Sequence, residues 1–244
     1  MEAVILAAGI GKRLKPLTSE LPKAFIPIGD SLLLYYSLNN IRSIGITDVF
    51  IVVGFMENYF KKKLGNKYDD INITYISNKQ YSTTGSMYSL SQTKGYLDED
   101  ILLLESDLLY EKRALTELIN YTYPNVILTS SIRQSGDEVF IHMDDDNCLT
   151  NLGKNIDKTG ANSELVGISK LSLDFLNELY KKAEEDYVNG EKNYHYEEVI
   201  YKLSKSYPVK CLFIEDLLWT EIDTHEDLEK ARKNIYPRIR DKQM

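Results

Sequence analysis

The part of this chain that most limits its possible folds is its beginning, residues 3–23, which read AVILAAGIGKRLKPLTSELPK. Val4–Leu6 form a continuous apolar run, as in a strand that is buried on both faces. Gly9 and Gly11 follow and can adopt positive φ at low cost, so successive backbone N–H groups can turn toward one point and form an anion-binding concavity. The same loop carries the cations Lys12, Arg13, Lys15 and Lys23. A phosphate chain is the simplest ligand for such a loop.

Two common phosphate-binding motifs do not fit this loop. A Walker loop requires a glycine where Leu6 stands and a serine or threonine in place of Arg13. A dinucleotide fingerprint requires a third glycine where Leu14 stands. The alternative interpretation is a solvated basic loop that follows a core strand.

Length and charge narrow the class of protein. The 244 residues suffice for one large α/β domain, which we place at residues 1–235, followed by a tail or linker at 236–244. Acidic residues outnumber basic ones, 37 to 29, and give a net charge of -8. This balance argues against a nucleic-acid partner, because such binding depends on an excess of Lys and Arg.

The cysteines and the apolar runs bear on the compartment. Cys148 and Cys211 have neither CxxC spacing nor a nearby histidine, which predicts free thiols in a reducing compartment and no zinc site. No leader-like segment opens the chain, and no apolar run approaches the roughly 20 residues of a membrane span. We therefore expect a cytoplasmic protein with no membrane partner; its oligomeric state is not indicated.

Strand-like and helix-like segments alternate along the chain. Apolar runs predict strands at Val4–Leu6, Val49–Val53, Ile71–Ile76, Ile101–Leu104, Val126–Ile132, Val139–Met143, Leu165–Ser169 and Val209–Ile214. Helices are expected at Leu32–Ser43, Met87–Lys94, Leu173–Tyr187 and Tyr196–Ser206, and from Thr224, where Asp227 completes a capping box. Alternation of this kind predicts a Rossmann-like three-layer α/β/α sandwich with a mixed, mostly parallel central sheet.

Two carboxylates stand where such a sheet binds its ligands, beyond the carboxyl ends of strands. Asp107 follows the run Ile101–Leu104, and Asp223 follows Trp219–Ile222. Adjacent strands of one sheet would bring them together, and carboxylates beside a triphosphate suit Mg²⁺. The alternative for each aspartate is a helix cap or a turn, and Asp223 directly precedes a predicted helix.

The N-terminal string L-A-A-G-x-G-x-R-L-x-P-L-T-x-x-x-P-K resembles the opening of the nucleotidyltransferases, which join a nucleoside triphosphate to a sugar phosphate or a small alcohol phosphate. The resemblance implies that Asp107 and Asp223 hold the catalytic Mg²⁺, although many relatives have Gly-Asp where this chain has Ser106-Asp107. Glu105 and Glu221 are then supporting or structural candidates. Arg13 and Lys23 are implied as the catalytic phosphate contacts. The implied nucleotide-binding residues are Leu6, Ala7, Ala8, Gly9, Gly11, Lys12, Thr83, Thr84, Gly85 and Ser86.

Later segments resemble the branch that contains phosphocholine cytidylyltransferases and their relatives acting on 2-aminoethylphosphonate. They include Gly85–Leu90, Asn151–Lys154 and Trp219–Asp223. This resemblance implies that CTP and phosphocholine or 2-aminoethylphosphonate are the substrates. Paired glutamates fit a primary ammonium, aromatic residues fit a methylated one, and simple packing of the tyrosines is the alternative. The candidate acceptor-binding residues are Lys154, Tyr194, Tyr196, Glu197, Glu198 and Trp219.

The expected reaction is an in-line attack by a phosphate or phosphonate oxygen of the acceptor on the α-phosphorus, with release of pyrophosphate. No general base is required, because the nucleophile is already an anion at neutral pH. The rate would come from holding two anions together and screening their repulsion. The alternatives are a sugar-1-phosphate nucleotidylyltransferase of the same fold and a catalytically inactive relative that senses nucleotides.

Overall fold

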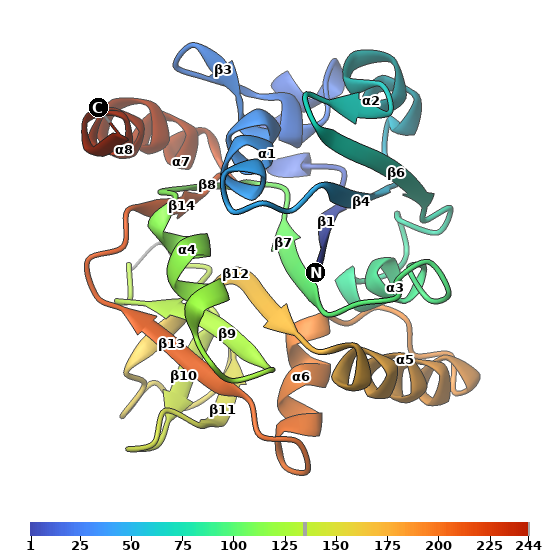
Figure 1. The fold of residues 1–244 in the computed structure, drawn as a ribbon, viewed down its shortest axis with the longest axis vertical. Coiled ribbons are helices and arrows are strands. Elements are labelled where there is room, and N and C mark those ends of the chain that lie inside the picture. Colours follow the sequence, from blue (N-terminus) through green and yellow to red (C-terminus); the bar gives the residue numbers. More distant parts are fainter. Residues whose placement is uncertain (134–135, 244) are drawn as a thin grey trace.

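A parallel sheet forms the centre of the computed structural model, which describes residues 1–133 and 136–243 (Figure 1). Its strands are β7 (Ile101–Glu105), β1 (Glu2–Ala7), β4 (Asp48–Val53) and β6 (Ile71–Ser77), in that spatial order. All three neighbouring pairs are parallel. The apolar run at the start of the chain is therefore an inner strand, as the sequence predicts.

Antiparallel strands extend this sheet on both sides. Beyond β6 lies β5 (Lys67–Tyr68), and beyond β7 lies β12 (Ser163–Leu171). The second half of β12 pairs with β7 and its first residues pair with β10, while β9 runs along its other side. The remaining strands of this region are β9 (Val126–Ser130), β10 (Phe140–Met143), β11 (Leu149–Gly153) and β13 (Lys210–Ile214). The sheet is therefore mixed, with a parallel centre.

Helices cover both faces of the sheet, and alternate residues of β1 contact the two layers. Ala3, Ile5 and Ala7 lie in the core that packs against α1 (Leu33–Ser43), α2 (Glu57–Leu64) and α4 (Arg113–Asn120). Val4 and Leu6 lie in the core that packs against α3 (Ser86–Ser91), α5 (Leu173–Val188) and α6 (Tyr196–Ser204). The predicted three-layer architecture is confirmed.

Asp223 reaches the sheet by a route that the sequence did not indicate. A separate two-stranded sheet pairs β14 (Trp219–Glu221) with β8 (Leu108–Tyr110) in antiparallel fashion. Because β8 starts one residue after Asp107 and β14 ends two residues before Asp223, this small sheet brings the two aspartates together. The expectation of adjacent strands in one main sheet is therefore wrong, although the proximity that it predicted is present.

The C-terminal segment folds back beside this small sheet (Figure 1). Thr224 caps α7 (His225–Lys230), and Asp227 completes the predicted capping box. A π-helical turn, Ala231–Ile235, leads into α8 (Tyr236–Gln243). The sequence suggested only a polar tail here, but α8 buries Ile239 in a core shared with Leu14.

Several predicted elements have shifted ends, and others were missed. The predicted strand Val126–Ile132 ends at Ser130, and the helix expected at Met87–Lys94 spans Ser86–Ser91. The short helices α2 and α4 and the strand β11 were not predicted.

Both cysteines are free thiols, as expected. Within residues 1–133 and 136–243, no helix has the length and apolar character of a membrane span. The two-residue strands β2 (Pro27–Ile28) and β3 (Ser31–Leu32) form a hairpin.

Candidate active site

A cavity of about 630 Å³ opens at the carboxyl ends of β1 and β7, where open α/β sheets bind their ligands. Its walls come from the loop after β1, the turn after β7, the start of α3 and the start of α6. The predicted nucleotide-binding residues that line it are Leu6, Ala7, Ala8, Gly9, Gly11, Lys12, Thr84, Gly85 and Ser86. Thr83 does not line this cavity and instead lines a smaller neighbouring one of about 490 Å³.

Contacts among its own residues hold the backbone of the loop after β1 in place. Gly11 adopts φ +65°, and a Cβ atom there would lie 3.1 Å from Thr18 Cγ2. The hydroxyl of Thr18 donates a hydrogen bond to the carbonyl oxygen of Gly11 at 2.8 Å. Leu14, in the 3-10 turn Lys12–Leu14, is fully buried and anchors the loop to the core. The loop therefore presents Lys12 and Arg13 to the cavity on a fixed backbone.

Lys23 lies between the two aspartates that were predicted to hold metal. Its ammonium donates to Asp107 Oδ2 at 2.6 Å and to Asp223 Oδ1, and its side chain is 10% exposed. Burial alone would lower the pKa of Lys23, but the carboxylates of Asp107, Asp223 and Glu221 outweigh burial and raise it. Burial opposes ionisation of Asp223 as well, yet Lys23 holds the pKa of Asp223 below its ordinary value. Both groups are therefore charged at neutral pH.

Ion pairs continue from Asp223 along the rim of the cavity. The Arg13 guanidinium donates to Asp223 Oδ2 at 2.5 Å and to Asp137 Oδ2 at 2.9 Å. Lys154 donates to the other oxygen of Asp137 at 2.5 Å. Asp137 was not predicted, because nothing in its irregular sequence surroundings distinguishes it from a solvated residue. The resulting series of paired residues is Lys154, Asp137, Arg13, Asp223, Lys23 and Asp107.

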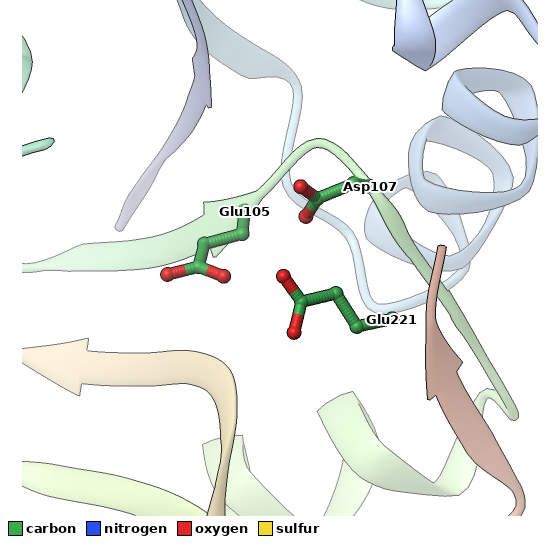
Figure 2. Close-up of side chains that lie close together, drawn as sticks. All are labelled: Glu105, Asp107 and Glu221. Atoms are coloured by element: carbon green, nitrogen blue, oxygen red, sulfur yellow. The ribbon is translucent and has the colours of Figure 1, made fainter. Parts of the chain in front are cut away.

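An acidic cluster shares Asp107 with this series. Ligand oxygens of Glu105, Asp107 and Glu221 all lie within 4.8 Å of one another, and Figure 2 shows their carboxylates turned toward a common space. Burial, together with the neighbouring carboxylates, raises the pKa of both glutamates well above its ordinary value. Asp107 Oδ1 is buried without a hydrogen-bond partner. From the sequence, Glu105 and Glu221 were only supporting or structural candidates, but the structure groups them with Asp107 as oxygen donors of the kind that Mg²⁺ prefers.

The start of α6 is joined to the loop that carries Gly85 and Ser86. The Gly85 N–H donates to the carbonyl oxygen of Lys192 at 2.9 Å, and a Cβ atom on Gly85 would lie 1.9 Å from the carbonyl oxygen of Tyr194. Ser86 Oγ lies 3.1 Å from His195 Nδ1 and accepts from the backbone N–H of Tyr196 at 3.2 Å. The predicted nucleotide loop and the predicted acceptor segment therefore form one packed unit.

The predicted acceptor-binding residues lie in three different environments. Lys154 and Glu197 line the cavity. Tyr194 and Glu198 line the smaller neighbouring cavity instead. Tyr196 is fully buried beneath the first cavity, where its hydroxyl donates to Glu105 Oε1 at 3.0 Å.

Trp219 lies in the core and does not line either cavity. Its indole N–H donates to Ser130 Oγ at 2.7 Å. The guanidinium carbon of Arg133 lies 3.5 Å from the centre of the indole ring, and Arg133 also pairs with the buried Glu164. Arg133, which the sequence did not suggest, lines the cavity at this point.

One protein family and several known proteins are similar to this chain in sequence. Residues 2–127 match the family described as Nucleotidyl transferase. A CMP-5'-(3-aminopropyl)phosphonate synthase from Streptomyces rubellomurinus is 26% identical over 97% of this chain and 39% of its own length. A choline-phosphate cytidylyltransferase from Streptococcus pneumoniae is 30% identical over 52% of this chain and 53% of its length. A CTP:phosphoglutamine cytidylyltransferase from Campylobacter jejuni is 26% identical over 94% of this chain and 98% of its length. The chain thus spans about half or less of the first two relatives.

Two solved structures share the fold. One is a CTP:phosphocholine cytidylyltransferase from Streptococcus pneumoniae, with a TM-score of 0.79 and 23% identity over 95% of this chain and 97% of that one. The other is an inositol-1-phosphate CTP transferase from T. maritima, with a TM-score of 0.79 and 22% identity over 96% of this chain and 97% of that one. The predicted fold class is confirmed.

Proposed function

Because this chain belongs to the nucleotidyl transferase family, we propose that it is a Mg²⁺-dependent cytidylyltransferase. It joins CTP to a small phosphorylated or phosphonylated amino compound and releases pyrophosphate. The names of the three relatives, from aminopropylphosphonate to phosphoglutamine, support CTP as the nucleotide and an acceptor of this class. Phosphocholine and 2-aminoethylphosphonate are the acceptors that we favour from the sequence.

The observation that carries this proposal is the position of Lys23. Its ammonium lies between Asp107 and Asp223, at the carboxyl end of the sheet and beside the glycine loop. Arg13 approaches Asp223 from the other side at 2.5 Å. Cations and carboxylates interleaved in this way suit a site where a metal-bound polyphosphate meets a second anion.

Mg²⁺ fits the acidic side of the cavity. The available donors are carboxylate oxygens, and the buried Asp107 Oδ1 has no hydrogen-bond partner. We assign its binding to Asp107 and Asp223, with Glu105 and Glu221 as further oxygen donors beside Asp107. When bound, Mg²⁺ supplies charge neutralisation at the phosphates.

The reaction follows from the charges of the side chains. An anionic oxygen of the acceptor attacks the α-phosphorus of CTP, the new P–O bond forms, and the bond to the leaving pyrophosphate breaks. Lys23 and Arg13 screen the repulsion between the two anions and hold them in line. No proton has to be removed from the nucleophile, so the site requires no general base. His195 lines the cavity, and its Nδ1 atom lies 3.1 Å from Ser86 Oγ. The reaction needs no proton transfer through this histidine.

Pyrophosphate release tests the nucleotide and the acceptor together. The purified protein is incubated with CTP, UTP, ATP, GTP or dTTP, each with phosphocholine, 2-aminoethylphosphonate or glucose 1-phosphate. We expect release from CTP, with an amino acceptor, and only when Mg²⁺ is present. Release from UTP or dTTP with glucose 1-phosphate would instead favour a sugar-1-phosphate nucleotidylyltransferase. No release in any combination would favour a nucleotide sensor.

A further inference from the structure

We propose that Glu197 selects an acceptor that carries a primary ammonium group, and that a trimethylated ammonium is a poor substrate. This inference rests on the proposed cytidylyltransferase function and decides between the acceptor classes that the function leaves open. It is based on a buried oxygen of Glu197 that has no hydrogen-bond partner among the described residues, and on where the nearby aromatic side chains lie.

Glu197 lies in the first turn of α6, lines the cavity and is 8% exposed. Its Oε2 atom is buried and has no hydrogen-bond partner in the described structure. A buried carboxylate oxygen without a donor is costly, so such an atom at a cavity wall is a place for a ligand donor. An ammonium group with N–H bonds supplies both the hydrogen bond and the opposite charge.

Two basic side chains act on the Glu197 carboxylate, His195 and Lys154, and both have partners of their own. The Lys154 ammonium lies 2.5 Å from Asp137, and His195 Nδ1 lies 3.1 Å from Ser86 Oγ. Among residues 1–133 and 136–243, none donates a hydrogen bond to Glu197 Oε2. The cavity wall therefore carries a carboxylate, Glu197, whose Oε2 has no partner within the part of the chain that the structure describes. A cationic group of the ligand would supply that partner.

A trimethylated ammonium has no N–H bond and is bound mainly by aromatic faces. The aromatic residues suggested for that role do not surround Glu197. Arg133 already occupies the face of Trp219, at 3.5 Å from the ring centre. The Tyr196 hydroxyl is bound to Glu105, and Tyr194 lines the smaller cavity with Lys202 Nζ 5.4 Å from its ring centre.

The two aromatic residues that do line the main cavity belong to other packing groups. Phe60 on α2 is fully buried, with its ring centre 4.9 Å from that of Phe25. Tyr81 packs against Phe55 at 6.3 Å and against Gly54. A trimethylated head group would therefore leave Glu197 Oε2 desolvated and without a hydrogen bond.

The two ends of the acceptor must also be close together. Tyr196, the residue before Glu197, contacts Glu105 of the acidic cluster at 3.0 Å. Glu197 itself lies close to this cluster, because both glutamates line the same cavity and, after burial and Asp107, the charge of Glu197 helps to raise the pKa of Glu105. A short zwitterion, with its phosphate or phosphonate beside Lys23 and its ammonium at Glu197, matches this arrangement.

Acceptors that differ only in N-methylation test the inference. We compare kcat/KM for phosphoethanolamine, phosphocholine and the amine-free ethyl phosphate at saturating CTP and Mg²⁺. The wild-type protein is expected to prefer phosphoethanolamine to phosphocholine by about tenfold or more, the effect of one charge-assisted buried hydrogen bond. Glu197→Gln should lower kcat/KM for phosphoethanolamine by a similar factor, and should lower kcat/KM for ethyl phosphate, which lacks the ammonium, much less. Glu185→Gln, on the exposed face of α5, is the matched control and should change neither value.

The outcomes separate the inference from the function on which it rests. If kcat/KM for phosphocholine is at least equal to that for phosphoethanolamine, the inference is wrong but the proposed function stands. An equal loss for all three acceptors in Glu197→Gln has the same consequence, with circular dichroism and thermal melting as the check on folding. The wild-type ratio decides the question even if that variant fails to fold. Absence of CTP turnover with every acceptor overturns the proposed function and this inference together.

Discussion

The Lys23 ammonium lies 2.6 Å from Asp107 Oδ2, although the two residues are 84 positions apart in the chain. Asp107 follows the strand β7, while Lys23 starts the 3-10 turn Lys23–Phe25 at the end of the N-terminal loop. The lysine therefore screens a group of carboxylates that would otherwise repel one another in a buried place. A site of this kind is built to accept further positive charge together with phosphate.

Replacing Lys23 is expected to remove activity while the chain still folds. Lys23→Ala should lower kcat/KM for pyrophosphate release by about a hundredfold or more, because the ammonium that screens the two anions is lost. Stability should fall as well, since Asp107 and Asp223 lose their shared partner. Lys15→Ala, in the same loop but outside the cavity lining, is the control and should retain activity. Comparable turnover in the two variants would contradict the assigned role of Lys23.

Asp107 is expected to be needed for the metal rather than for the fold. Asp107→Asn keeps the shape of the side chain but removes its charge, so we expect loss of turnover and a higher Mg²⁺ requirement. Chelation by EDTA should stop the wild-type reaction, and added Mg²⁺ should restore it. Binding of Mn²⁺, measured by electron paramagnetic resonance, gives a readout that does not depend on turnover. Unchanged Mn²⁺ binding in Asp107→Asn would remove Asp107 from the metal site.

The acidic cluster should make the metal-free protein less stable as the pH rises. Burial and the neighbouring carboxylates raise the pKa of Glu105, so the folded state binds more protons than the unfolded chain. The cost of ionising Glu105 is absent below the ordinary pKa of 4.5 and grows as the pH rises above it. Glu105→Gln should therefore raise the melting temperature at pH 7 by about 2 °C or more, with a smaller gain near pH 5. A gain that grew toward acid pH would contradict this assignment.

The sequence predicted the parts of the site that depend on local structure. The strand Val4–Leu6, the glycine loop and the strand-end Asp107 each follow from residues that are close together in the chain. The pairing of Arg13 with Asp137 joins residues 124 positions apart, and no local pattern indicates it. The chemistry of a carboxylate such as Glu105 depends on burial, which only the assembled fold determines.

The roles of the aromatic residues also could not be predicted from the sequence alone. Sequence patterns placed Tyr196 and Trp219 near the acceptor, but composition does not tell which face of a ring is free. In the folded chain Arg133 covers Trp219, and Tyr196 turns its hydroxyl to Glu105. Similarly, the pairing of β14 with β8 outside the main sheet could not be foreseen from two short apolar runs.

Tyr196 is expected to position Glu105 rather than to touch the substrate. Tyr196→Phe removes the donor that lies 3.0 Å from Glu105 Oε1, and should cost about 1–3 kcal/mol of unfolding free energy in urea. The Mg²⁺ concentration for half-maximal activity should also change, because a carboxylate of the cluster loses its anchor. Tyr180→Phe removes a comparable buried hydroxyl, 2.6 Å from Thr93 Oγ1, and is the matched control. The same change in Mg²⁺ requirement in both variants would show that Tyr196 has only a structural effect.

Gly9 offers a test of the nucleotide site that leaves the fold unstrained. A Cβ atom on Gly9 would have no other atom within 4 Å, and Gly9 lines the cavity. Gly9→Ala should therefore melt at the wild-type temperature but raise KM for CTP by about tenfold or more, because the added methyl group takes space that the nucleotide needs. Gly85→Ala is the contrasting variant: its Cβ atom would lie 1.9 Å from the carbonyl oxygen of Tyr194, so it should lower the melting temperature as well. Wild-type KM in Gly9→Ala would place the nucleotide elsewhere in the cavity.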